Sequence, residues 1–185
     1  MTNVLRNKKG EPIKIALIGG ARTGKDTIGY YLTTVYGFDR HAFADSLRDN
    51  LSRVFPDLPL EPKPRDAMIK YGQLCREIDP LVWIKHLHRK TSDVTYAFGL
   101  ENFVITDVRQ QNEIDYCIEQ GYTLVKVVAD RETVIDRALK HGEVLDVDNE
   151  LDKLALAYDG LTIENNGDLD HLYKQVDFLI EVLQG

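Results

Sequence analysis

The chain has 185 residues with 23 basic and 30 acidic side chains, which give a formal net charge of −7. Its 43% hydrophobic and 29% charged residues are ordinary for a globular protein and argue against a disordered or collagen-like chain. The two cysteines are too few for a disulfide scaffold and have no metal-ligand spacing.

The distribution of apolar and charged residues also limits the cellular location and the partners that we expect. No apolar run approaches the roughly 20 residues needed to span a bilayer, and the N-terminal residues lack the apolar stretch of a signal peptide. We therefore expect a cytoplasmic protein without a membrane partner. We also expect no nucleic-acid partner, because acidic residues are in excess and a polyanion attracts positive charge.

Strand-like and helix-like patterns alternate from residue 13 onward. Residues 13–18 form a short apolar run that predicts a buried strand, and apolar residues at helical spacing predict a helix over 25–36. A second strand is predicted at 38–43 and a second helix at 45–55. Residues 56–64 contain four of the six prolines and predict a loop, because each proline removes a backbone donor.

The rest of the chain continues the alternation. In chain order we predict helices at 65–75 and 80–89, a strand at 102–106, a helix at 111–120, a strand at 123–128, helices at 132–140 and 150–157, a strand at 161–164 and a helix at 169–183. Strands that alternate with helices imply a parallel sheet with both faces covered. We therefore predict one doubly wound α/β domain over residues 1–185.

The first predicted strand is followed by a glycine-rich loop that fits the pattern G-x-x-x-x-G-K in the required strand–loop–helix context. Its glycines let backbone N–H groups approach phosphate oxygens, and the following helix adds the positive end of its dipole. Lys25 can reach the β- and γ-phosphates of a nucleotide. The predicted nucleotide contacts are Gly20, Ala21, Arg22, Thr23, Gly24, Lys25, Asp26 and Thr27.

Asp26 departs from the usual pattern, in which Ser or Thr follows the lysine and supplies a hydroxyl to Mg²⁺. A carboxylate beside a triphosphate is repelled unless a metal ion lies between them, so Asp26 indicates a Mg²⁺ contact, direct or through water. The alternative is that Asp26 only stabilises the N-terminus of its helix. Thr27 keeps a hydroxyl one place later and is a candidate for the α-phosphate.

Four segments together resemble the phage-type deoxynucleoside monophosphate kinases of the P-loop nucleoside-monophosphate kinase superfamily. Residues 24–27 resemble the phosphate loop of that family, and residues 36–48 look like its second strand and the start of its monophosphate-binding region. Residues 75–84 are similar to its R-x-I-x-P…W segment, and residues 105–113 to its T-D-V-R-x-x-N-E signature. The last third of the chain matches the superfamily only loosely.

The resemblance implies a five-stranded sheet of order 2-3-1-4-5 with a small lid. It also implies transfer of the ATP γ-phosphate to a deoxynucleoside monophosphate, with ATP and Mg²⁺ as cofactors and small nucleotides as substrates. The acceptor-binding region is then expected over about residues 45–90, and the lid over about 131–157.

Two charged residues close the third predicted strand. Asp107 lies at the carboxyl edge of the sheet, where ligands bind, and is a candidate to hold Mg²⁺ through water or to cap the next helix. Arg109 lies just beyond it, and its planar fork of donors suits a phosphate bound bidentately. A plain surface arginine is the alternative for Arg109.

Further residues receive roles from the family likeness. It implies that Arg48 helps to bind the acceptor phosphate and that Asp45 faces the transfer region, although Asp45 could equally be a helix cap. Arg76 is a second phosphate candidate. Trp83 either stacks on the acceptor base or belongs to the core.

The lid and the adenine contact also come from the resemblance. Arg131 and Arg137 follow the fourth predicted strand, and Arg137 is the better candidate for a lid arginine that closes over the phosphates. The following loop, residues 142–149, is acidic and lacks further arginines, which departs from the expected lid. Asn166 lies in the turn after the last predicted strand, which is expected to contact adenine or to be an ordinary tight turn.

Two other functions stay open at this point. Dephospho-coenzyme A kinases share the fold, but their loop ordinarily ends in Gly-Lys-Ser/Thr. A non-catalytic nucleotide-binding regulator is the alternative from another class, although a pure switch needs no second phosphate site. The sequence does not identify the base, the sugar or the oligomeric state, for which a homodimer is one alternative.

Overall fold

Five parallel strands form one sheet in the order β2-β3-β1-β4-β5 in the computed structural model, which describes residues 5–61, 64–142 and 158–185. The strands are β1 (Lys14–Ile18), β2 (Asp39–His41), β3 (Phe103–Val108), β4 (Thr123–Val128) and β5 (Leu161–Glu164). Every neighbouring pair is parallel. The predicted strand order and fold class are confirmed.

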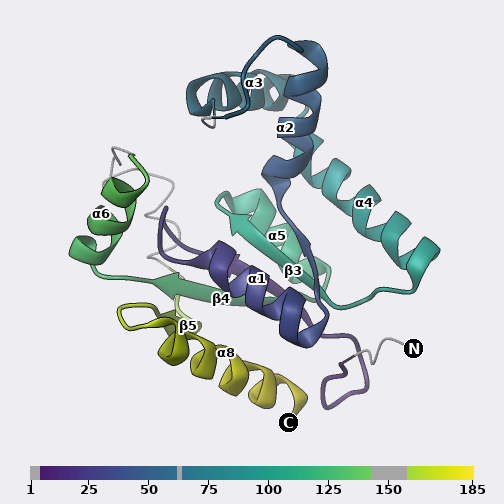
Figure 1. Ribbon diagram of the computed structural model, residues 1–185. Coiled ribbons are helices and arrows are strands. Elements are labelled where there is room, and N and C mark those ends of the chain that lie inside the picture. Colours follow the sequence, from purple (N-terminus) through teal and green to yellow (C-terminus); the bar gives the residue numbers. More distant parts are fainter. Residues whose placement is uncertain (1–4, 62–63, 143–157) are drawn as a thin grey trace.

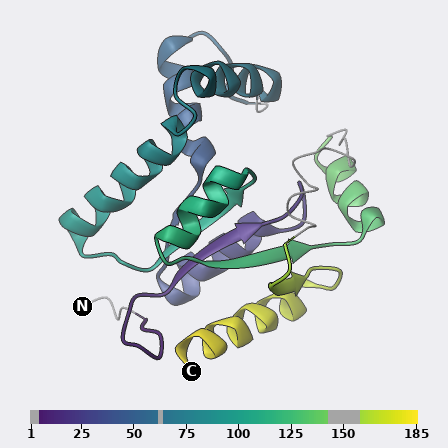
Figure 2. The same ribbon diagram turned by 180° about the vertical axis from the view of Figure 1, so that it is seen from behind.

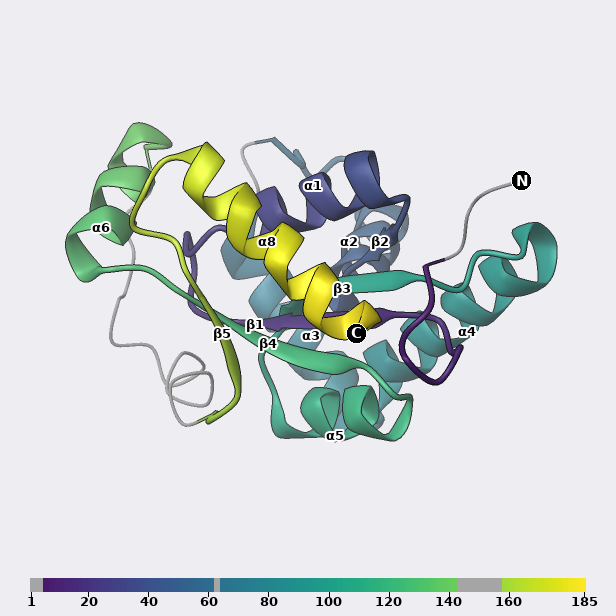
Figure 3. The same ribbon diagram turned by 90° about the horizontal axis from the view of Figure 1, so that it is seen from below.

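Helices lie on both sides of this sheet. They are α1 (Lys25–Tyr36), α2 (Phe43–Val54), α3 (Arg65–Ile78), α4 (Val82–Phe98), α5 (Gln111–Glu119), α6 (Arg131–Lys140) and α8 (Leu169–Gln184). Figures 1 and 3 show α1 and α8 on one face, and Figure 2 shows α4 and α5 in front of the other. The predicted helix at 150–157 lies outside the described residues. None of the helices in the described part of the chain has the length and apolar character that a membrane span requires.

The alternation of side chains along the central strand creates a separate core on each face. Ile15 and Leu17 of β1 are fully buried in the core that contains α1 and α8. Ala16 and Ile18 are fully buried in the core that contains α2, α4 and α5. Successive residues of a strand point to opposite faces. A strand covered on both faces is therefore apolar at every position, as residues 15–18 are.

The start of α2 differs from the prediction. The helix begins at Phe43 instead of residue 45, and β2 is correspondingly shorter than the predicted strand. The carboxylate of Asp107 accepts hydrogen bonds from the backbone amides of Phe43 and Ala44, which satisfies donors that a helix start leaves open. This cap comes from a distant strand, so the local sequence carries no signal for it.

The helix α4 also differs, because it continues to Phe98 instead of ending near residue 89. Its last turns are mostly exposed, but Thr91 is buried and Val94 packs against the core. Gly99 then ends the helix with φ of 65°, a left-handed conformation that glycine adopts without strain. The position of Gly99 therefore determines where α4 ends, and the end of the strongly apolar stretch does not.

The helix α1 offers a matched test of core packing. Leu32 is fully buried, whereas Val35 on the same helix is 56% exposed. We expect Leu32→Ala to lower the free energy of unfolding by about 2–5 kcal/mol and Val35→Ala to change it by no more than about 0.5 kcal/mol. Urea unfolding of both variants checks this. Similar losses in the two variants would contradict the assignment of Leu32 to the core.

Candidate active site

The loop between β1 and α1 approaches two other segments so closely that it requires glycine at both ends. A Cβ atom on Gly19 would lie 2.3 Å from the carbonyl oxygen of Val127, and one on Gly24 would lie 2.1 Å from Nδ2 of Asn165. Gly24 has φ of 106° and Arg22 has φ of 60°, a region that non-glycine residues seldom occupy. The loop is therefore compact, and it lies at a helix N-terminus, where backbone amides favour an anion.

The ammonium group of Lys25 lies inside this loop. Lys25 is only 7% exposed, and its Nζ donates to the carbonyl oxygens of Gly19, at 2.7 Å, and Gly20. The hydroxyl of Thr23 donates to the carbonyl of Gly20 at 3.0 Å. The predicted nucleotide contacts from residues 20 to 27 are consecutive on this loop and the first turn of α1.

Arg40 of β2 joins two carboxylates that the sequence analysis singled out. Its Nη2 lies 3.4 Å from Oδ1 of Asp26, and its Nη1 lies 3.3 Å from Oδ2 of Asp45. The side chain of Asp26 is 86% exposed and that of Asp45 is 33% exposed. Asp45 also accepts a hydrogen bond from the backbone amide of Ala42 at 3.1 Å. It therefore stabilises the start of α2, as its helix-cap alternative predicted, while also facing Arg40.

Asp107 caps α2 instead of the next helix in the chain. Its two carboxylate oxygens accept from the amides of Phe43 and Ala44, at 2.8 and 2.9 Å. Burial raises the pKa of the Asp107 carboxyl above its usual value, against those two hydrogen bonds and the nearby charge of Arg109, which lower it. Asp107 thus caps a helix, as the capping alternative predicted, but that helix is α2 and not the helix that follows β3.

Glu113 holds the backbone that follows β3. Its Oε2 accepts from the amides of Arg109 and Gln110 at 2.8 and 3.0 Å, and its Oε1 lies 3.9 Å from Nη2 of Arg76. Glu113 is 4% exposed. Burial and the neighbouring Asp107 raise the pKa of the Glu113 carboxyl to about 7. The arrangement brings Arg76, Arg109 and the carboxyl groups of Asp107 and Glu113 together at one end of β3.

The other acceptor-side candidates, Arg48 and Trp83, have partners of their own within the protein. Arg48 on α2 forms an ion pair with Glu61 at 2.9 Å. Trp83 is 3% exposed and its Nε1 is 3.4 Å from the carbonyl oxygen of Gly72. The indole is thus enclosed by protein, and this packing favours the core alternative over stacking on a base.

Arg137 of α6 contacts the phosphate loop directly. Its Nη1 donates to the carbonyl oxygen of Arg22 at 3.3 Å, and its Nη2 donates to the backbone and side-chain oxygens of Asn165 at 3.0 and 3.2 Å. The side chain of Asn165 in turn donates to the carbonyl oxygen of Thr23 at 2.8 Å. Figure 1 shows α6 on one side of this loop, with α2 and α3 on the other. The part of the predicted lid beyond residue 142 lies outside the described residues.

The structure places Asn166 differently from its neighbour. The side-chain oxygen of Asn166 accepts a hydrogen bond from the backbone amide of Asp130 at 2.7 Å. It therefore links the turn after β5 to the start of α6, close to the nucleotide loop but without a described contact to it. Asn165, which the sequence analysis did not select, is the residue that contacts the loop.

Three residues at this site, Arg40, Glu113 and Asn165, received no role of their own in the sequence analysis, although Glu113 belongs to the family signature and Asn165 to the turn after the last strand. Arg40 stands between polar neighbours in a short strand, so nothing in the local pattern distinguishes it. Glu113 lies three residues after Gln110 at a helix start, which is the spacing of a capping box, and this signal was available. Asn165 directly precedes Asn166, and only the tertiary structure separates their roles.

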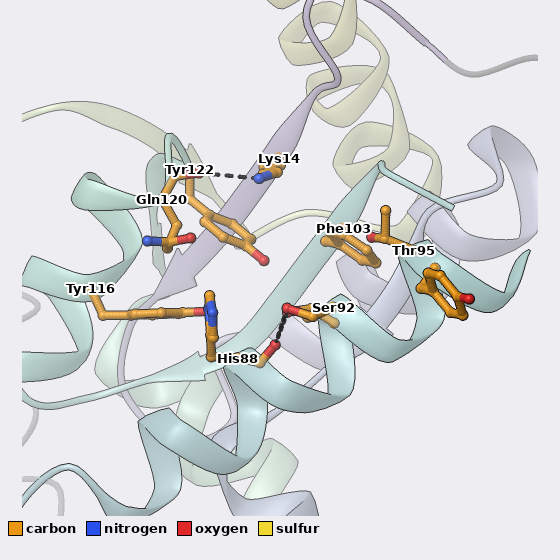
Figure 4. Close-up of a pocket in the computed structure, with 10 residues that line it drawn as sticks. Lys14, His88, Ser92, Thr95, Phe103, Tyr116, Gln120 and Tyr122 are labelled. Atoms are coloured by element: carbon orange, nitrogen blue, oxygen red, sulfur yellow. Dashed lines mark hydrogen bonds between the residues drawn. The ribbon is translucent and has the colours of Figure 1, made fainter. Parts of the chain in front are cut away.

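A cavity of about 360 Å³ lies away from the phosphate loop, at the amino ends of the strands. Figure 4 shows the ring of His88 next to the hydroxyl end of Tyr116 in the lining of this cavity. Several of its polar groups have partners within the protein, since Lys14 donates to the carbonyl of Gln120 and Ser92 to that of His88. This cavity is therefore a gap between α4, α5 and the sheet, and we assign it no ligand.

The raised pKa of Glu113 predicts a pH-dependent stability. A carboxyl with an ordinary pKa of 4.5 when unfolded and about 7 when folded binds protons more readily in the folded chain. Its contribution to stability is therefore present below about pH 4.5 and lost as the pH rises through about 7. We expect the wild type to lose about 3 kcal/mol relative to Glu113→Gln across that window, measured by urea unfolding. Parallel pH profiles for the two proteins would contradict the assignment.

Comparisons with solved structures support the fold described above. Among solved structures, the chain is similar to a gluconokinase from Sinorhizobium meliloti 1021, at 14% identity and a TM-score of 0.55 over 94% of each chain. It is also similar to the shikimate kinase of Aquifex aeolicus vf5, at 15% identity and a TM-score of 0.54 over 91% of this chain and 96% of that one. At these identities the likeness shows the fold alone. No curated protein matches the chain by sequence.

The family assignment comes from a match between the sequence and a family model. The model described as deoxynucleotide monophosphate kinase matches residues 65–176, which is more than half of the chain. The match includes α3, the end of β3 and the start of α5, where Arg76, Arg109 and Glu113 lie. The protein is a phosphotransferase with the P-loop kinase fold that phosphorylates a small molecule, and it belongs to the deoxynucleotide monophosphate kinase family.

Proposed function

We propose that this enzyme transfers the γ-phosphate of ATP to a deoxynucleoside monophosphate, with Mg²⁺ as cofactor, and releases ADP and the deoxynucleoside diphosphate. The observation that carries the proposal is a phosphate loop and an arginine at the ends of neighbouring strands. Ile18, the residue before the loop, pairs with Val108 of β3, and Arg109 follows at once. A loop for one nucleotide beside a separate phosphate-binding arginine suits a reaction between two phosphate groups.

The chemistry needs alignment and charge neutralisation more than it needs a reactive side chain. An oxygen of the acceptor phosphate attacks the γ-phosphorus while the bond from that phosphorus to the ADP oxygen breaks. In this proposal the loop amides and Lys25 bind the β- and γ-phosphates and neutralise the charge that moves. Arg109 binds the acceptor phosphate or the group in transfer with its planar fork.

The residues at the loop fit a Mg²⁺ ion that arrives with the nucleotide. Among the described residues no three His, Cys, Asp or Glu side chains converge on a metal site. Mg²⁺ commonly binds to one or two carboxylates together with substrate phosphates, and the exposed carboxylate of Asp26 suits that role. We propose that Asp26 holds the ion directly or through water and that Asp107 contributes through water. When bound, the ion neutralises charge on the phosphate oxygens.

The acceptor region proposed for residues 45–90 contains Arg48 and Arg76. Arg76 is 24% exposed and already lies beside Glu113, so we propose it as a second arginine for the acceptor phosphate. Arg48 is more exposed and would exchange its contact with Glu61 for the phosphate. Asp45 would face the transfer region from the start of α2.

The lid is proposed to extend over residues 131–157, with Arg137 as its phosphate-binding arginine. The described contact between Arg137 and the carbonyl of Arg22 supports a position next to the triphosphate. Asn166 is proposed to contact adenine through the turn that contains it. The cytoplasmic location and the homodimer stay predictions.

A screen of acceptors tests the proposed reaction. We expect coupled ADP release with ATP to be fastest, by kcat/KM, for a deoxynucleoside monophosphate among all deoxy- and ribonucleoside monophosphates and dephospho-coenzyme A. Lys25→Met is the inactive control, with an expected rate loss of roughly 10³–10⁵ because a phosphate-neutralising charge is removed. Preference for dephospho-coenzyme A would contradict the proposal. Binding of ATP without phosphorylation of any tested acceptor would also contradict it. A Lys25→Met protein with a tenth of normal turnover would refute the assigned role of Lys25.

Asp26→Asn tests the proposed metal contact. The change keeps the size of the side chain and the start of α1 but removes the charge. We expect the Mg²⁺ concentration for half-maximal activity to rise several-fold or more, because an acidic ligand of the ion is lost. If Asp26 only stabilises the helix terminus, the Mg²⁺ titration stays where it was and stability falls by about 1 kcal/mol or less. A melting curve beside the titration separates these two outcomes.

A further inference from the structure

Asn165 joins three separate parts of the molecule at the carboxyl edge of the sheet. It follows β5 directly and is only 5% exposed. Its backbone amide donates to the carbonyl of Val128 at the end of β4, at 2.8 Å. Its side-chain Nδ2 donates to the carbonyl of Thr23 in the phosphate loop, and its Oδ1 accepts from Arg137 of α6. The side-chain amide of Asn165 therefore donates to the phosphate loop and accepts from α6.

The contact with Thr23 fixes more than one carbonyl group. A peptide unit is planar and trans, so the N–H of Gly24 points away from the carbonyl of Thr23. Holding that carbonyl from outside the loop therefore orients the Gly24 amide toward the opposite side. The same reasoning applies one residue earlier, because Arg137 donates to the carbonyl of Arg22 and thereby orients the amide of Thr23.

The close packing around Gly24 makes this orientation specific. A Cβ atom on residue 24 would lie only 2.1 Å from Nδ2 of Asn165, so no side chain fits there. An aspartate at position 165 could still accept from Arg137, but it would place an oxygen against the Thr23 carbonyl in place of a donor. The two contacts therefore require the amide and not merely a polar side chain of that size.

We propose that Asn165 is a positioning residue for ATP, which orients the Gly24 amide toward the phosphates and holds Arg137 against the loop. The proposal rests on the proposed function, since it concerns the same nucleotide site. It differs from a merely structural role in what it predicts. A structural amide affects folding stability alone, whereas a positioning amide affects the affinity for ATP in a chain that is still folded.

The experiment compares Asn165→Asp with Gln175→Glu, a matched control on α8. Gln175 donates from its side-chain amide to the carbonyl of Glu164 at 2.8 Å and accepts from the amide of Glu164 at 3.1 Å. Both changes turn an amide into a carboxylate and remove a donor to a backbone carbonyl, which is that of Thr23 for Asn165 and that of Glu164 for Gln175. Only Asn165 contacts the phosphate loop. Asn165→Ala is a further variant that introduces no charge.

The readouts are the calorimetric Kd for ATP, the KM of each substrate and the melting temperature without nucleotide. We expect Asn165→Asp and Asn165→Ala to weaken ATP binding by about 10- to 100-fold, because the loop amides are misaligned. The acceptor KM is expected to stay within about twofold. Gln175→Glu is expected to bind ATP as the wild type does, even where its melting temperature falls.

The failures of the two proposals can be told apart. If the wild type itself does not bind ATP, the proposed function is wrong and this inference falls with it. If the wild type binds ATP and the folded Asn165 variants bind it equally well, the inference alone is wrong. It is also wrong if Gln175→Glu weakens ATP binding as much as Asn165→Asp, because the loss then follows from general damage at the end of β5.

Discussion

The groups of the candidate active site lie together because parallel strands deliver their carboxyl ends to one edge of the sheet. The strand β1 lies between β3 and β4, so the phosphate loop emerges between the segments that follow those two strands. Arg109 follows β3 on one side of the loop, and Val127 of β4 packs closely against Gly19 on the other side. If β1 were at the sheet edge, one of these sides would be open to water. The central position of β1 is the constraint on which the loop, the arginines and the position of α6 all depend.

The same edge concentrates charge in places where water is scarce. Glu113 is buried there and Asp107 is partly buried, and each accepts hydrogen bonds from two backbone amides. These bonds offset part of the cost of burying a charge. The amides belong to the start of α2 and to the segment after β3, so the two carboxyls also fix the backbone that carries Asp45 and Arg109. Charge burial and the orientation of the site are thus coupled.

The side of the loop that faces α2 differs from the side that faces α6. Toward α2, Arg40 lies between the exposed Asp26 and the half-exposed Asp45 at 3.3 to 3.4 Å, and solvent weakens such pairs. Toward α6, Asn165 and Arg137 bind the loop carbonyls through mostly buried bonds. One side is therefore ready to exchange its partners, as a metal or a phosphate would require, whereas the other is a fixed support.

The sequence by itself determined the elements that depend on local pattern. Local sequence patterns identified all five strands, and the spacing G-x-x-x-x-G-K placed the phosphate loop between a strand and a helix. These two features could be predicted because each depends on one short segment. The strand order came from the family likeness of four segments, residues 24–27, 36–48, 75–84 and 105–113, and is confirmed by the sheet.

Only the tertiary structure decided which side chains meet. Asp107 caps a helix that begins more than sixty residues earlier in the chain, so the local sequence of α2 contains only the contribution of Asp45 to its start. Asn165 and Asn166 are adjacent and chemically identical, yet one is buried against the loop and the other bonds to Asp130. Successive residues after a strand point in different directions, and their partners come from distant segments. The pairing of donors and acceptors therefore depends on how β4, β5 and α6 pack, which local pattern does not contain.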